Sequence, residues 1–422
     1  ARAKVKARVR RAWKQANPGL TPEAAYAKNA STAPTDHELT NGFPEHISPF
    51  ARPKLGNPPP DRIENAFISW CPLCGSHAFN VTFDSKDPFR RGTSSCCKAA
   101  LFADREAYPA GSPLRPDSSA KFLHLDGRRI EVPCLEYTDK DGVTGELFTR
   151  TLFDHKRWLA QGCDLVRQYG QKFEETGDPL YAHKIAVLLD KVADTYYGLP
   201  LSFRNELCKG KDGDLLTRAE WEALPRPAIY SNGPIGPWNR RTPVFNKGWL
   251  NMSREHIWIE PYARVRHHPA FKEVSRRLHG DPEALDRKIR AKLLRELSLA
   301  FQAIFGQKLL HNYQEAIYTD LWLLGILVED PVLTAFAGPC QELSMYNHTY
   351  QDGLNGEGAQ NYMAMPGGYY YPALTNARGW AAYDPAFLEN NPFFYAASSE
   401  LNRLNTVRGL FIEFGDQHQY LW

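Results

Sequence analysis

The chain has 422 residues, of which 43% are hydrophobic and 23% charged, so it can bury a large core and is not a disordered protein. Its formal net charge of +3 is too small for a dedicated nucleic-acid-binding protein. Because the sequence has no run of 18 or more apolar residues, we expect no membrane-spanning helix. The length favours two or three domains.

Residues 1–60 form a basic and proline-rich segment. Its arginines and lysines, concentrated in the first eleven residues, are typical of a solvated helix face. The chain begins with Ala1 rather than Met and ends on Leu421 and Trp422 without a polar tail. We therefore expect it to be part of a longer protein.

Residues 61–150 have the pattern of short strands and turns. Apolar and polar residues alternate around Val81, and strand-like stretches follow at 129–132 and 146–148. Asp-Gly pairs at 126–127 and 141–142 are typical of turns. This pattern predicts a small β-rich segment.

The same segment carries a group of cysteines. Cys71 and Cys74 form a Cys-x-x-Cys-Gly turn, and Cys96 and Cys97 follow after a gap. Ser94 and Cys97 keep the spacing of a second Cys-x-x-Cys pair. Two such pairs typically hold structural zinc in closed tetrahedral coordination, as in a zinc ribbon. Cys71, Cys74 and Cys97 are the expected ligands, with Cys96 or His77 as the fourth; disulfides or free thiols are the alternatives.

Residues 151–422 are predicted to be mainly α-helical. Apolar residues recur there every three or four positions, which indicates helices with one buried face. The first stripe comprises Trp158, Leu159, Leu165, Val166 and Tyr169, and the second comprises Tyr181, Ile185, Leu188, Leu189, Val192 and Tyr196.

Turn residues separate these helices. Between the two stripes, Gly177 suits the left-handed position that ends a helix, Asp178 can cap the next helix, and Pro179 suits its first turn. Asp-Pro pairs recur at 281–282, 330–331 and 384–385. Repeated helix pairs of this kind predict an incomplete α/α toroid of antiparallel helices.

Polar side chains gather between residues 310 and 371, next to apolar helix. Amide, imidazole, phenol and carboxylate groups are all present there. They include His311, Asn312, Tyr313, Glu315, His348, Asp352, Glu357, Tyr362 and Tyr369. One interpretation is that they cap helix ends and fill a core.

The order of these features resembles the heparinase II/III-like polysaccharide lyases and their alginate-lyase relatives. The resemblance covers roughly residues 65–422. It depends on the Cys-Pro-x-Cys-Gly turn, on the helix pair around 175–182, on the His-Asn start of a long helix, and on the later Asp352-Gly353 and Glu357-Gly358 pairs followed by Tyr362. Members of that family have an α/α toroid followed by an antiparallel β-sandwich, and we expect the present chain to stop before the sandwich.

The resemblance implies β-elimination next to a uronic acid in an anionic polysaccharide. Asn312 or His311 would neutralise the uronate carboxylate, so that the weakly acidic C5 proton can be removed. Tyr362, or Tyr369 in its place, would act as base and acid. Relatives often have Asn-His where this chain has Asn312-Tyr313.

The resemblance also indicates the surroundings of the site. The residues expected to bind substrate are Tyr313, Glu315, His348, Glu357, Arg266 and Trp249. Arg266 belongs to a basic group with His267 and His268, for which a solvated surface is the alternative, and Trp249 can stack on a sugar or pack in a core. We expect no organic cofactor, and a secreted or periplasmic location.

Two other functions fit the same sequence. A glycoside hydrolase would use Asp352 and Glu357 as its acid and its base or nucleophile. A non-catalytic relative would bind or display carbohydrate without cleaving it, since a fold does not fix a function.

Overall fold

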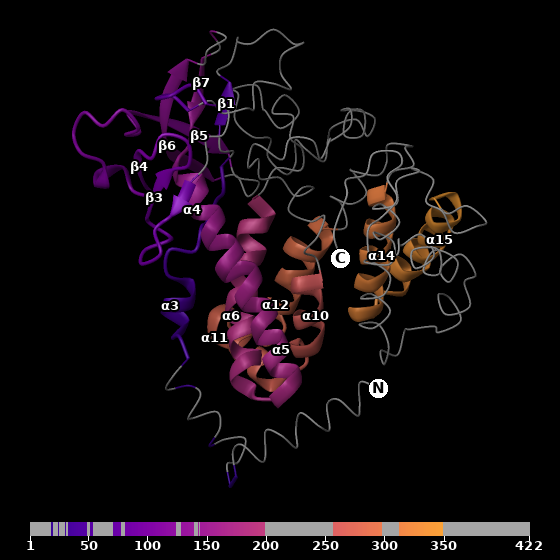
Figure 1. Cartoon of the computed structure of the whole chain (residues 1–422). Coiled ribbons are helices and arrows are strands. Elements are labelled where there is room, and N and C mark those ends of the chain that lie inside the picture. Colours follow the sequence, from indigo (N-terminus) through magenta and orange to yellow (C-terminus); the bar gives the residue numbers. More distant parts are fainter. Residues whose placement is uncertain are drawn as a thin grey trace, which may run out of the picture. The chain divides into compact units, whose positions relative to one another are not determined.

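The computed structural model describes residues 18–19, 24, 30, 33–48, 51–53, 71–76, 81–123, 128–138, 142, 144–198, 256–297 and 312–348. These residues form helices and two small antiparallel sheets (Figure 1). The chain divides into two compact units, one of residues 1–251 and 264–303, the other of residues 252–263 and 304–422.

The first unit contains all the strands found in the described residues. Its three-stranded sheet has the order β2 (Val81–Phe83), β3 (Arg91–Ser94), β4 (Ala100–Phe102). Its four-stranded sheet has the order β1 (Ala51–Pro53), β7 (Thr144–Leu147), β6 (Arg129–Thr138), β5 (Ser118–Leu123). Every pairing is antiparallel. The predicted β-rich segment is therefore present, and the strand predicted at 129–132 extends to Thr138.

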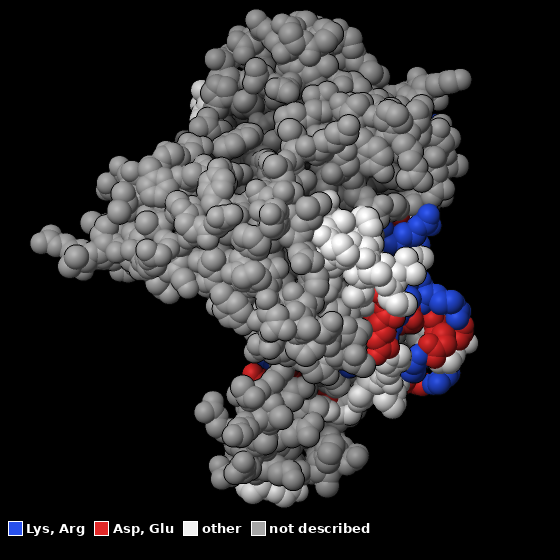
Figure 2. Space-filling view, turned by 90° about the vertical axis from the view of Figure 1, so that its right-hand side faces the viewer, with Lys and Arg blue, Asp and Glu red and all other residues white. Residues whose placement is uncertain are grey.

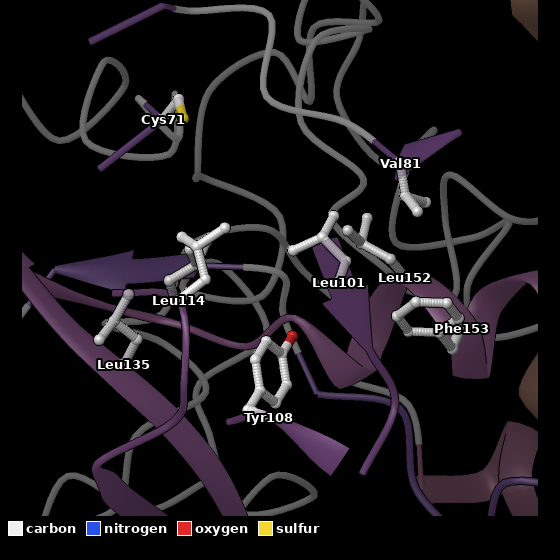
Figure 3. Close-up of a cluster of buried hydrophobic side chains, with 9 residues drawn as sticks. Cys71, Val81, Leu101, Tyr108, Leu114, Leu135, Leu152 and Phe153 are labelled. Carbon is white, nitrogen blue, oxygen red and sulfur yellow. The ribbon is translucent and has the colours of Figure 1, made fainter. Parts of the chain in front are cut away.

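A compact core joins both sheets to helix α4 (Arg150–Arg157). Leu101 of β4, Leu147 of β7 and Phe153 of α4 are each almost fully buried in it. Tyr108 lies among these side chains (Figure 3). Its hydroxyl donates to the carbonyl of Phe102 at 3.1 Å. Cys71 is part of the same cluster, so the cysteine turn is attached to the hydrophobic core.

The helical part of this unit begins with a long hairpin. Helix α5 (Val166–Thr176) ends at Gly177, whose φ of 69° is left-handed, and helix α6 (Pro179–Gly198) begins two residues later. Asp178 Oδ1 accepts the Leu180 amide at 2.9 Å and so caps α6. The turn predicted from sequence is therefore confirmed residue by residue, and α5 and α6 lie side by side (Figure 1).

The apolar stripe predicted for α6 is buried. Ile185, Leu188, Leu189, Val192 and Tyr196 are fully inaccessible, whereas Tyr181 is half-buried. The other predicted stripe differs, because Trp158–Leu165 is a π-helix (η3) between α4 and α5. A π-helix turns fewer degrees per residue than an α-helix. Leu159 and Leu165 are consequently only half-buried, while Trp158, Val166 and Tyr169 are buried.

Short helices surround this hairpin. Helix α3 (Asp36–Thr40) is preceded by a capping box between Thr35 and Glu38. Helix α11 (Pro269–His279) packs on α6 and ends at Gly280, which has a φ of 76°. It is followed by α12 (Ala284–Ile289) and the π-helical η4 (Arg290–Leu294). The Asp-Pro pair at 281–282 thus precedes a helix, as predicted, although α12 begins two residues later.

Ion pairs connect these helices. Asp36 of α3 accepts from His183 at 2.8 Å, from Lys184 at 2.7 Å and from Arg277 of α11 at 2.7 Å. These three donors hold the Asp36 pKa well below its usual range, against the opposing effect of burial. On the next turns of α6, Asp190 and Asp194 pair with Lys288 at 2.7 Å each.

The second unit contains a hairpin of α14 (Asn312–Leu327) and α15 (Pro331–His348), together with most of α10 (His256–Val265). Asp330 Oδ1 accepts the amides of Val332 and Leu333 at 3.0 Å, which confirms the predicted cap at 330–331. A Cβ on Gly325 would lie 2.4 Å from Thr334 Oγ1, so only glycine permits this close approach.

The helix hairpins agree with the helical part of the prediction, and closure into an α/α toroid stays a prediction. The boundaries predicted at residues 60 and 150 also stay predictions. The Asp-Pro pair at 384–385 lies outside the described residues. Among the helices of the described residues, none is long and apolar enough to cross a membrane.

Candidate metal centre

Four cysteines come together at one end of the three-stranded sheet. The Sγ atoms of Cys71, Cys74, Cys96 and Cys97 all lie within 4.8 Å of one another. Cys71 Sγ and Cys97 Sγ are 3.7 Å apart. Cys71 is buried, Cys96 and Cys97 are half-buried, and Cys74 is exposed. These four side chains can hold a metal ion.

The first pair is presented by a tight turn. The Gly75 amide donates to the Cys71 carbonyl at 2.8 Å, and the Cys71 amide donates to the Ser76 carbonyl at 2.8 Å. Gly75 has a φ of 67°, which glycine adopts at little cost. Together these features turn the backbone so that Cys71 and Cys74 face the same point.

The second pair lies on the turn between β3 and β4, which has the same hydrogen bonds. The Lys98 amide donates to the Ser94 carbonyl at 3.0 Å, and the Ser94 amide donates to the Ala99 carbonyl at 2.8 Å. Lys98 has a φ of 61°, in the position that Gly75 occupies in the first turn. Ser94 and Cys97 therefore correspond to Cys71 and Cys74, as their spacing predicts.

The thiols of the cluster differ in acidity. Burial raises the pKa of Cys71 to about 12, although the Cys74 and Leu73 amides donate to its sulfur. At Cys97 burial also opposes ionisation, but the Ser94 hydroxyl and the Ala99 amide lower the pKa to about 7. Donors around the sulfur thus stabilise negative charge at this turn, as a thiolate ligand requires.

The geometry bears on whether the cysteines form disulfides and on which residue is the fourth ligand. Every cysteine in the described part of the chain is a free thiol, so no disulfide joins the cluster. His77, which was the other candidate for the fourth ligand, and Cys208 lie outside the described residues. Cys96 is the fourth cysteine that the fold brings to the cluster.

The spacing of the sulfurs suits tetrahedral coordination. Zinc–thiolate bonds are about 2.3 Å long, which places the sulfurs of a tetrahedron about 3.8 Å apart. The Cys71–Cys97 separation of 3.7 Å equals such an edge within 0.1 Å. No tetrahedral site needs more than four donors, so a metal held here would have no open position for a substrate.

The residues predicted for β-elimination lie mostly outside the described part. His311, Trp249, Asp352, Glu357, Tyr362 and Tyr369 are among the residues that the structure does not describe. Asn312 is the first residue of α14, and Tyr313 and Glu315 lie in the same helix. His348 is the last residue of α15. Their roles stay predictions.

The three residues of the basic group at 266–268 differ in how far they are exposed to solvent. Arg266 is only 4% exposed, so its side chain is not solvated as the alternative interpretation assumed. His267 is exposed. His268 Nδ1 accepts the Ala270 amide at 3.1 Å and caps α11, and burial lowers its pKa. Trp258 is fully buried.

Sequence reasoning did not predict a cleft of about 720 Å³ in the first unit. It is lined by residues 37–48, by β6, by α4 and by α6. The strap 41–48 is held by Arg157, which donates to the Asn41 carbonyl at 2.5 Å, and by Thr195, which donates to the Pro44 carbonyl. No local pattern indicates this cleft, because its walls are far apart in sequence.

Asp154 lies in this cleft with an altered acidity. Burial raises its pKa to about 6, although Arg150, whose Nε is 3.4 Å from Asp154 Oδ2, opposes the shift. Asp194, also in the cleft, has its pKa lowered by Lys288 and Lys292, against the effect of burial. Basic side chains, those of Arg128, Arg150 and Lys191, line the same cleft, so it carries charges of both signs.

The charged side chains visible in Figure 2 are mixed as well. In Figure 2 the described Lys and Arg side chains lie among Asp and Glu side chains on the face that it presents. Comparisons with protein-family models, curated proteins and solved structures find no match to this chain. The resemblance to polysaccharide lyases therefore depends on the sequence motifs alone.

Proposed function

We propose that the four-cysteine cluster is a structural zinc site that stabilises the three-stranded sheet. The observation that carries the proposal is the convergence of four Sγ atoms within 4.8 Å on two turns with the same hydrogen bonds. Sulfur donors favour zinc over magnesium or calcium, which prefer oxygen ligands. Coordination by four thiolates leaves no position for substrate, so the metal would be structural.

Zinc content measured after purification from zinc-supplemented cultures tests the site. We expect one zinc per chain in the wild type, and loss of zinc in Cys74→Ser. Cys340→Ser, which removes a half-buried cysteine of α15, is the matched control and keeps its zinc. A wild-type chain without zinc, which also fails to bind Co²⁺ with a thiolate charge-transfer band after reduction, would contradict the proposal.

The activity we propose for the chain is β-elimination in a uronate polysaccharide, at a secreted or periplasmic location. The support is the order of sequence motifs from Cys71 to Tyr362. Asn312 or His311 would hydrogen-bond the uronate carboxylate, and Tyr362 or Tyr369 would transfer the proton. Tyr313, Glu315, His348, Glu357, Arg266 and Trp249 are the candidate contacts to the sugar.

An assay over several substrates tests this activity. The chain is incubated with alginate, heparan sulfate, hyaluronan, chondroitin and ulvan, and absorbance of the unsaturated uronate product is followed. We expect a rise with one substrate that is lost in Tyr362→Phe and kept in Tyr137→Phe, a control in β6. New reducing ends without absorbance would favour the hydrolase with Asp352 and Glu357. Binding without cleavage would favour the carbohydrate-binding protein.

A further inference from the structure

The second cysteine turn differs from the first at one of its two ligand positions. In the first turn the two ligand positions hold Cys71 and Cys74, and in the second they hold Ser94 and Cys97. The backbone hydrogen bonds are nevertheless the same. In both turns the amide of the first residue donates to the carbonyl five residues later, and the amide of the fifth residue donates to the carbonyl of the first. Ser94 therefore occupies the place that a fourth cysteine would have.

Ser94 is a buried residue in contact with the cysteine cluster. Its side chain is completely buried, whereas Cys96 and Cys97 beside it are half-buried. Its Oγ lies 3.0 Å from Cys96 Sγ. A hydroxyl is a poor ligand for zinc compared with a thiolate, but it is a good hydrogen-bond donor to one.

We propose that Cys96 supplies the fourth thiolate from outside the regular Cys-x-x-Cys register, and that Ser94 is a positioning residue whose hydroxyl donates to the Cys96 sulfur. This inference rests on the proposed zinc site. On metal binding the Cys96 thiol releases its proton to water and the sulfur can then only accept a hydrogen bond. Because a hydroxyl carries a single proton, the Ser94 O–H then donates to the Cys96 sulfur, 3.0 Å away, rather than to the Cys97 sulfur.

The arrangement has a chemical consequence. Hydrogen bonds from the surroundings fix the orientation of metal ligands, and their loss weakens metal affinity about 10- to 100-fold. Ser94→Ala should therefore keep four thiolates while it weakens zinc binding by about tenfold. Cys96→Ser removes a ligand and should weaken binding further.

Placing a cysteine at the regular Cys-x-x-Cys position tests the inference. The zinc-loaded protein is treated with iodoacetamide, and alkylated cysteines are located by peptide mass mapping. In the wild type we expect all four clustered cysteines to be protected. In Ser94→Cys we expect the new residue to take the regular position and to be protected, so that Cys96 is released and alkylated. Iodoacetamide treatment after zinc removal is the control in which every clustered cysteine reacts.

Cobalt spectra give a second readout that does not depend on reactivity. Cys96→Ser should lower the thiolate-to-Co²⁺ charge-transfer absorbance, and Ser94→Cys combined with Cys96→Ser should restore it. Alkylation of Cys96 in the zinc-loaded wild type, or an unchanged cobalt spectrum in Cys96→Ser, would overturn the inference while leaving the zinc site in place. A wild type that binds neither metal would instead overturn the site itself.

Discussion

The β-rich part and the helical part of the first unit are stabilised in different ways. Strands β2, β3 and β4 have only three or four residues each, and their core cluster is shared with the other sheet and with α4. Helix α6 has 20 residues, of which 14 are buried, and it packs on both α5 and α11. A short three-stranded sheet buries little apolar surface by itself, whereas a long helix that packs on two others buries much of its surface against them.

The proposed zinc site is consistent with this difference. A metal site contributes most where the hydrophobic core is smallest, because it links turns that few other contacts connect. In the helical part, charged residues have the connecting role instead, with Asp36 joining three helices. The two parts should therefore respond differently to metal removal, to loss of apolar volume and to pH.

The largest effect is expected from zinc removal. With a chelator present, the segments 71–76 and 91–102 should lose protection from amide hydrogen exchange, while α6 keeps its protection. Structural zinc binding contributes on the order of 10 kcal/mol in small zinc domains, so the exchange of the sheet should rise strongly. Hydrogen-exchange mass spectrometry with and without restored zinc measures this. Equal exchange in both states would mean that the sheet does not depend on metal.

The next effect concerns the helical core. Leu189→Ala removes a fully buried side chain from α6 and should destabilise the first unit by about 3 kcal/mol, through lost burial and a cavity. Lys191→Ala, on an exposed position of the same helix, is the matched control and should change little. Urea unfolding followed by circular dichroism measures both variants. A loss at Leu189 no greater than at Lys191 would show that α6 is not the stabilising element.

A smaller effect is expected from the charge network of Asp36. Asp36→Asn leaves His183, Lys184 and Arg277 without their shared carboxylate and should cost about 2 kcal/mol at pH 7. The folded pKa of Asp36 is depressed, so this contribution is present above the unfolded value of about 3.9 and is lost as the pH falls below it. Unfolding free energies at pH 7 and pH 3 measure it. Asp164→Asn, which removes a half-exposed aspartate paired with Arg167 at the surface, is the control.

The smallest effect is expected from Asp154, in the helix that joins the two parts. Its folded pKa of about 6 lies above the unfolded value of about 3.9, so its contribution to stability is present at low pH and is lost as the pH rises from about 4 to 7. The wild type should therefore lose stability relative to Asp154→Asn over this interval. Asp104→Asn, on the other side of Arg150, should show no such trend. A constant difference between wild type and Asp154→Asn would contradict the shift.

The sequence by itself determined the features that act over a few residues. Gly177, Asp178 and Pro179 specify the turn between α5 and α6 through one left-handed position, one cap and one fixed φ. The Cys71–Cys74 spacing specifies a turn that points two thiols at one place. Such signals are readable because the interacting groups are at most five residues apart.

Only the tertiary structure decided the features that join distant segments. The burial of Arg266, the meeting of Asp36 with Arg277, and the cleft around Asp154 each involve elements that no local pattern connects. The π-helical turn at 158–165 likewise changes which residues of a predicted stripe are buried. The placement of Ser94 depends both on local sequence and on tertiary structure. Its spacing from Cys97 is local, but its burial beside Cys96 depends on packing of the whole sheet, because packing decides which side chains share a site.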